Sequence, residues 1–174
     1  MPPRRFPAAG LLLAIALLMT PLHRELSACG MGWWPSLERA LEVAPEDGRL
    51  VVMVFTGNDW GLGSMHLDQR VFEEGEFSYR FGTDFIPVNF DFPQLMPLSD
   101  EATAYQVSWA ERYQVRSLPT FIVVRPDGSE FARFEYRGES ADQMLKLIAG
   151  WRERWLARAP ISGATGTPTV VEVR

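Results

Sequence analysis

The strongest constraint on the fold is an uninterrupted apolar run, Leu50–Phe55. Its three valines favour an extended strand, and a strand with apolar side chains on both faces must be covered on both sides. Segments with the helical spacing of apolar residues precede and follow this run, at 37–44 and 64–72. A buried strand between two helices predicts an α/β fold in which helices cover both faces of a sheet.

The rest of the chain continues this alternation. The helix at 64–72 extends loosely through Phe81, and a polar stretch lies at 93–100. Strands are expected at 85–90, 120–124 and 129–136, and helices at 102–113 and 144–155. A capping box at Ser140 precedes the last helix. This order predicts a single α/β domain with a central mixed sheet flanked by helices.

Prolines and glycines mark the boundaries. The segment 45–48, Pro-Glu-Asp-Gly, should break the first helix. Pro87 cannot donate to a sheet ladder, so its strand should be distorted or lie near an edge. The turn signal at 126–128, Pro-Asp-Gly, joins the last two strands as a hairpin.

The first 28 residues have the order of an export signal. Arg4 and Arg5 precede an apolar run at 8–19, which is short for a membrane-spanning helix. The following Leu-Ser-Ala-Cys, ending at Cys29, resembles the lipobox of bacterial lipoproteins, in which the cysteine is lipidated. Cleavage near Ala28, lipidation of Cys29 and an uncleaved anchor remain three alternatives. All three predict an exported protein of the periplasm or cell envelope.

Four segments are therefore expected along the chain. They are a signal peptide or anchor at 1–28, a short mature N-terminus at 29–33, a folded domain at 34–157 and a Gly/Ser/Thr-rich flexible tail at 158–174. The net charge is −5, and no basic block is dense enough to follow phosphates, so no nucleic-acid partner is expected. Membrane contact is expected only through an N-terminal lipid or anchor, because the exported part is acidic.

Cysteine and histidine counts limit the possible chemistry. Cys29 is the only cysteine, which excludes an intramolecular disulfide, a CxxC redox motif and a cysteine-based zinc site. An unlipidated Cys29 could pair with another chain. His23 and His66 are the only histidines, and His66 with Asp59 lacks a third ligand of the usual type. Neither a metal nor a cofactor is predicted.

Several segments together resemble the thioredoxin superfamily. Exported bacterial members have an active-site strand that ends in F-T-G-S-D-W-C-x-x-C, and residues 55–64 here read F-T-G-N-D-W-G-L-G-S. Further agreement lies in V-N-F-D-F-P at 88–93, Y-Q-V-R-S-L-P-T at 113–120 and P-D-G at 126–128. The resemblance covers residues 34–157 and implies a thioredoxin-like fold. It also implies that the Leu118–Pro119 bond is cis and faces the active site.

The departure from this family concerns both redox positions. Gly61 and Ser64 stand where the family has its two cysteines. Glycine has no side chain to attack a disulfide, and a serine hydroxyl cannot replace a thiolate in thiol–disulfide exchange. Val54 stands where many thioredoxins carry a buried carboxylate. The residues therefore predict that the chain is not a thiol–disulfide oxidoreductase.

Two other chemistries could use polar residues of the same region. Ser64, His66 and Asp68 have the residue types of a catalytic triad, but residues two apart on a helix point about 200° away from each other. Alternatively, the Ser64 hydroxyl near a helix N-terminus could hydrogen-bond a bound thiolate, as in a glutathione-transferase-like enzyme. The alternative to a binding function is such a thiol-related enzyme. A further alternative is a chain that is related to the thioredoxin-family oxidoreductases by descent only.

A binding function is favoured. Members of the family hold an extended polypeptide against the loop before the cis-proline, and this recognition uses backbone hydrogen bonds and needs no thiol. The groove predicted to bind a protein or peptide consists of Trp60, Leu62, Met65, Leu118 and Pro119. The predicted protein is a redox-inactive, thioredoxin-like binding module of the bacterial cell envelope.

Overall fold

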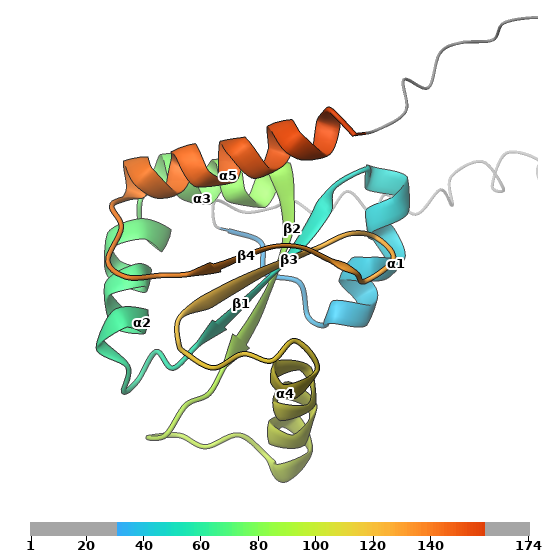
Figure 1. Ribbon diagram of the computed structural model, residues 1–174. Coiled ribbons are helices and arrows are strands. Elements are labelled where there is room, and N and C mark those ends of the chain that lie inside the picture. The colour runs from blue at the N-terminus through green and yellow to red at the C-terminus, as the bar shows by residue number, and fades with distance from the viewer. Residues whose placement is uncertain (1–30, 159–174) are drawn as a thin grey trace, which may run out of the picture.

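The central strand β1, Leu50–Thr56, is buried along its whole length in the computed structural model, which describes residues 31–158. It pairs in parallel with β2, Phe85–Asp91, and antiparallel with β3, Thr120–Val124. The hairpin partner of β3 is β4, Glu130–Glu135, so the sheet has the order β2-β1-β3-β4 (Figure 1). The predicted mixed sheet is confirmed.

Helices cover both faces of this sheet. They are α1 at Leu37–Asp47, α2 at Leu62–Leu67, the π-helical turn η1 at Asp68–Phe72, α3 at Gly75–Asp84, α4 at Asp100–Arg112 and α5 at Ala141–Leu156. Figure 1 shows α3 and α5 side by side across one face, while α1 covers the other. The single α/β domain expected from the sequence is therefore present.

The alternation of side chains along β1 divides the core into two layers. Val52 and Val54 belong to the layer beneath α3 and α5, whereas Met53 and Phe55 belong to the layer beneath α1. Trp151 of α5 is the largest side chain of the first layer and is 2% exposed. Burying such large apolar side chains on both sides of one strand is the main source of stability in a fold of this kind.

Strand β2 lies at one edge of the sheet, as its proline predicts. Pro87 pairs with Val52 of β1, and its own carbonyl accepts a hydrogen bond from Trp34 N–H at 2.8 Å. The edge position removes the need for the donor that proline lacks. The N-terminal segment thus packs along the outer side of β2 before α1 begins.

The first helix ends within the segment 45–48, as its proline and glycine predict. Helix α1 continues through Pro45 and ends at Asp47, where Gly48 adopts a positive φ of 66° and donates its N–H to the Ala44 carbonyl. Proline in the last turn leaves only one helical hydrogen bond unmade, and the glycine supplies the actual stop. Pro45 itself lies inside the helix, and the predicted end within 45–48 is confirmed.

The long helix expected from Ser64 is divided into three pieces. Helix α2 already begins at Leu62, η1 adds a wider turn, and α3 starts anew at Gly75. The Glu73 N–H donates to the Asp68 carbonyl at 3.0 Å, five residues back, which widens the turn and redirects the chain. Helix α4 also begins two residues before its expected start, because the Ser99 side chain caps it.

The last helix agrees with its pattern. The capping box at Ser140 is formed, and Met144, Ile148 and Trp151 are buried along one face of α5. Within residues 31–158, no helix has the length and apolar character needed to cross a bilayer. The predicted signal or anchor, Cys29 and the C-terminal tail beyond Arg158 lie outside the described residues.

Candidate functional site

The candidate site is formed where β1 and β2 end and β3 begins. The loop after β1 runs from Gly57 to Gly61 and leads directly into α2. The segment after β2 and the loop before β3 lie at the same end of the sheet, because β2 is parallel to β1 and β3 is antiparallel to it. Three chain segments far apart in sequence therefore meet beside Gly61.

Residues 61 and 64, which stand where the resembled family has its two cysteines, lie at the spacing of a dithiol pair. Ser64 is 1% exposed, and its Oγ accepts a hydrogen bond from the Gly57 N–H at 3.0 Å. A Cβ added to Gly61 would lie 3.7 Å from Ser64 Cβ. This separation is within the range found for half-cystine pairs. The chain thus retains the spacing of a dithiol motif but supplies a hydrogen atom and a hydroxyl in place of the thiols.

The loop before β3 is packed against the start of α2. The Leu118–Pro119 peptide bond is cis, and Pro119 is buried. A Cβ added to Gly63 would lie 3.0 Å from Pro119 Cδ, closer than an ordinary van der Waals contact. Glycine at this position therefore allows α2 and the proline to approach closely.

Trp60 is anchored but remains accessible. Its indole N–H donates to the Phe92 carbonyl at 2.7 Å, and 44% of the residue is exposed. Its ring lies over Gly57, where an added Cβ would be only 2.6 Å from the indole. The ring is thus held in one orientation at the surface, which lowers the conformational entropy that a binding partner would have to remove.

The five residues of the predicted groove differ in accessibility. Trp60 and Leu62 are exposed, Leu62 by 81%, whereas Met65 and Leu118 are half-buried and Pro119 is buried. Trp60 and Leu62 are therefore the members that can present most apolar surface to a partner. Pro119 instead supports the backbone beside them.

Asp59 organises a part of the site that sequence reasoning missed. Its carboxylate accepts hydrogen bonds from the backbone N–H groups of Gln94, at 2.9 Å, and Leu95, at 2.5 Å. These bonds hold the segment after β2 beside the Trp60 loop. Leu95 and Met96 are 79% and 81% exposed there. In the sequence, the available sign of this apolar surface was the pair of adjacent apolar residues within the polar stretch at 93–100.

The electrostatics of Asp59 follow from these contacts. Partial desolvation acts to raise the pKa of Asp59, but hydrogen bonds from the Gln94 and Leu95 backbones outweigh it and lower the pKa below 3.8. The carboxylate is therefore charged at neutral pH and keeps both hydrogen bonds. A second carboxylate holds the start of the same loop, since Asp91 accepts from Thr56 Oγ1 at 2.8 Å and from the Asn58 N–H at 2.9 Å.

The residues of the possible triad do not converge. The Ser64 hydroxyl is buried against Gly57, whereas His66 Nδ1 lies 2.6 Å from the Tyr136 hydroxyl, and Asp68 is exposed on η1. The buried Ser64 is also poorly placed to contact a bound thiolate. Within residues 31–158, no group of three or more metal-ligating side chains is assembled.

This sheet order, with helices on both faces and a cis-proline beside the start of α2, is the architecture of a thioredoxin-like domain. The family model described as "Thioredoxin-like domain" matches residues 37–149, and the chain belongs to this family.

Among curated proteins, the chain is similar to two from Chlamydia pneumoniae. It is 27% identical over 120 residues to "Disulfide bond reductase DsbH", which covers 68% of this chain and 72% of that protein. It is 22% identical over 137 residues to "Thioredoxin-related protein DsbJ". That match covers 79% of this chain but only 39% of DsbJ, so the chain spans about two-fifths of its length.

Solved structures show the same fold. A structure titled "DsbH Oxidoreductase" superposes with a TM-score of 0.66 at 22% identity and covers 75% of this chain and 90% of that one. A putative disulphide-isomerase from Bacteroides thetaiotaomicron gives a TM-score of 0.55 at 20% identity, with 72% and 96% covered.

Restoring the two thiols should produce a disulfide. In a Cys29→Ser background, Gly61→Cys with Ser64→Cys should oxidise to an internal disulfide under mild conditions, because the Cβ separation of 3.7 Å already suits one. Mass spectrometry after maleimide labelling, with and without reduction, measures this. The matched control, Leu62→Cys with Ser64→Cys, should stay reduced because side chains two apart on a helix diverge. Equal oxidation of both pairs would contradict the site geometry.

The Asp59 contact should be sensitive to acid. Because the pKa is lowered in the folded state, the unfolded chain takes up the proton first. The contact therefore stabilises the fold above pH 3.8 and is lost as the pH falls through the folded-state value. In an NMR titration, the Gln94 and Leu95 amide resonances should shift with a midpoint below 3.8. Asp59→Asn should abolish that transition and Asp142→Asn, on α5, should not; a midpoint above 3.8 would refute the assignment.

Proposed function

We propose that this chain is a redox-inactive thioredoxin-like protein of the bacterial cell envelope that binds an extended protein segment without forming a covalent bond. The observation that carries the proposal is the exposed apolar surface around the vacant dithiol position. Trp60, Leu62, Leu95 and Met96 all present large side chains there. Exposed apolar side chains gathered at one place are typical of interaction sites.

The proposed loss of redox activity rests on the residues at the site. Disulfide exchange needs a thiolate as nucleophile and a second thiol to resolve the mixed disulfide. Gly61 and Ser64 supply neither, and Cys29, the only cysteine, lies outside the motif. The names of the similar proteins include a reductase and an oxidoreductase. This chain would share their fold while lacking the groups that such chemistry requires.

The type of partner follows from the surface. An extended polypeptide can hydrogen-bond the backbone beside Pro119 while its apolar side chains cover Trp60 and Leu62. The indole is already fixed by its hydrogen bond to Phe92, so little ordering is needed on binding. The side chains of Leu95 and Met96 would adapt to partner side chains of different shape. The envelope location rests on the export-signal order of the first 28 residues.

The absence of redox turnover can be measured directly. The purified protein should reduce insulin disulfides in the presence of dithiothreitol no faster than dithiothreitol alone, because the site has no thiol. Turbidity from precipitated insulin B chain reports the rate. A bacterial thioredoxin serves as the positive control. Turnover at a rate comparable with that thioredoxin would overturn the redox-inactive assignment.

The binding surface can be tested by capture from the native envelope. Wild type, Trp60→Ala and Leu62→Ala are used as baits, and the affinity is measured for each protein enriched by wild type. Loss of an aromatic anchor at the centre of an interface typically costs about 2 kcal/mol or more, so Trp60→Ala should weaken binding about 30-fold. Leu62→Ala should weaken it less.

Two exposed positions elsewhere provide controls. Tyr79→Ala removes an aromatic side chain from α3 that is 71% exposed, and Glu153→Ala changes a charge on α5. Both should bind like wild type. If all baits recover the same proteins equally, or if only Glu153→Ala loses them, the interaction does not involve the surface around Trp60.

A further inference from the structure

Three arginine side chains surround one aromatic ring at the far end of the sheet. The guanidinium carbons of Arg125, Arg154 and Arg158 lie 5.2, 5.9 and 5.6 Å from the centre of the Phe131 ring. Phe131 itself packs edge-on against Trp155 of α5, with ring centres 6.1 Å apart. We call Arg125, Arg154 and Arg158 the arginine cluster.

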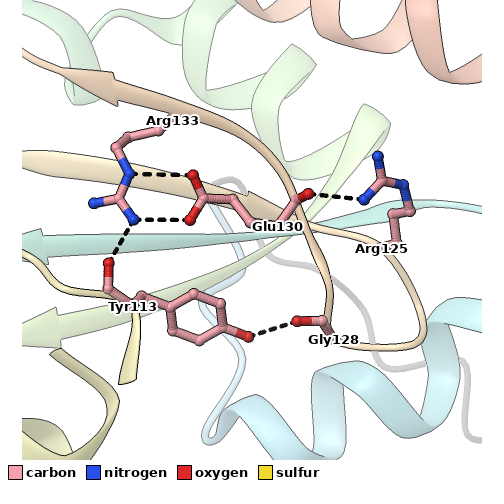
Figure 2. A network of polar contacts seen from close by, with 5 residues as sticks. All are labelled: Tyr113, Arg125, Gly128, Glu130 and Arg133. Carbon is pink, nitrogen blue, oxygen red and sulfur yellow. Dashed lines mark hydrogen bonds and ion pairs between the residues drawn. The ribbon is translucent and has the colours of Figure 1, made fainter. Parts of the chain in front are cut away.

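The acidic groups next to this cluster are engaged elsewhere. Figure 2 shows that the Glu130 carboxylate points to Arg133, whereas Arg125 donates to the Glu130 backbone carbonyl, at 2.7 Å. Arg125 also donates to the Ser129 hydroxyl, at 3.0 Å. The Asp127 carboxylate accepts from Ser129 N–H and Oγ at 2.9 and 2.6 Å. Those two hydrogen bonds, with a smaller contribution from the charge of Arg125, lower the pKa of Asp127.

The cluster thus carries positive charge that no direct ion pair among the described residues neutralises. Within residues 31–158, none of its three guanidinium groups lies within 4.0 Å of a carboxylate oxygen. This concentration of arginine occurs in a chain whose net charge is −5. Three like charges around one ring repel each other, and a bound anion would relieve that repulsion while accepting hydrogen bonds from them.

An open strand edge starts at the same place. Strand β4 is the last strand in the order β2-β1-β3-β4, so its outer edge has no partner strand among those described. Phe131, the centre of the cluster, is the second residue of β4. An unpaired edge offers backbone donors and acceptors to an extended polypeptide, which can add a further strand to the sheet.

We propose that β4 and the arginine cluster form a docking surface for an acidic, extended polypeptide segment. The segment pairs with the outer edge of β4, and its carboxylates contact the guanidinium groups around Phe131. A polypeptide satisfies both features, whereas an anionic bilayer would leave the strand edge unpaired and would repel the net negative chain. Charge complementarity and the open edge carry the assignment.

This surface is separate from the site of the proposed function. Along the β3–β4 pair, Thr120 faces Glu135 at the end near Pro119, and Val124 faces Glu130 at the opposite end. The cluster therefore lies at the other end of the sheet from Trp60. A partner could occupy either surface without the other.

The test uses the full chain and a fluorescent peptide, acetyl-Thr-Glu-Val-Glu-Val-Glu-Thr-amide, followed by anisotropy at low salt. The peptide should bind, and its glutamine analogue should bind at least about fivefold more weakly, because exposed charge pairs contribute modestly and additively. Arg154→Glu with Arg158→Glu should also weaken binding at least about fivefold, and added salt should weaken wild-type binding. Trp60→Ala should leave this affinity unchanged, which separates the result from the proposed function.

A matched charge control and a backbone control complete the experiment. Arg70→Glu with Lys146→Glu changes the net charge equally at exposed positions outside the cluster and should leave the affinity within about twofold. A peptide N-methylated on alternate amides should not bind, because it cannot pair with β4. The proposal is overturned if the peptide does not bind, or if its glutamine analogue binds equally well. It is also overturned if the N-methylated peptide binds undiminished, or if both double variants weaken binding equally. Capture by phosphatidylglycerol vesicles without peptide binding would overturn it in favour of a lipid surface.

Discussion

The burial of β1 on both faces is the constraint on which the rest of the structure depends. All seven of its residues are buried, so helices must cover the sheet on both sides. Because β1 pairs in parallel with β2 and antiparallel with β3, the loops after β1 and β2 and the loop before β3 meet at one end. The apolar strand therefore fixes both the layered architecture and the place where a functional site can form.

At that place, the backbone has the spacing of a dithiol pair, but residues 61 and 64 carry no thiol. Ser64 occupies a buried position against the Gly57 N–H, and a Cβ added to Gly61 would lie 3.0 Å from the Gly57 carbonyl oxygen and 3.7 Å from Ser64 Cβ. A hydroxyl oxygen accepts this backbone hydrogen bond more strongly than a sulfur atom would. The turn therefore does not need thiols for its stability. Residues 61 and 64 do not supply the thiol groups that dithiol proteins use in disulfide exchange.

Most of the fold could be predicted from local patterns, and the site only in part. The apolar run of β1, the proline of β2 and the capping box of α5 each act within a few residues, and each was read correctly. The helix expected from Ser64 through Phe81 is divided, because the Glu73 N–H donates to the Asp68 carbonyl five residues back, which the spacing of apolar residues does not indicate. Leu95 and Met96 were missed because their segment is placed by hydrogen bonds from Gln94 and Leu95 to Asp59, which lies 35 and 36 residues away along the chain. The arginine cluster likewise combines the β3–β4 hairpin with the end of α5, and no sequence period brings these together.

The close approach of Trp60 to Gly57 ties the two positions together. Any side chain at 57 would occupy the space of the indole, since a Cβ there would lie 2.6 Å from the ring. A protein in which the glycine is replaced must therefore have the Trp60 ring displaced or the tryptophan substituted, and it loses the hydrogen bond to the Phe92 carbonyl. Substitutions at 57 and 60 should consequently be inherited as a pair, and the effects of the two single changes should not add.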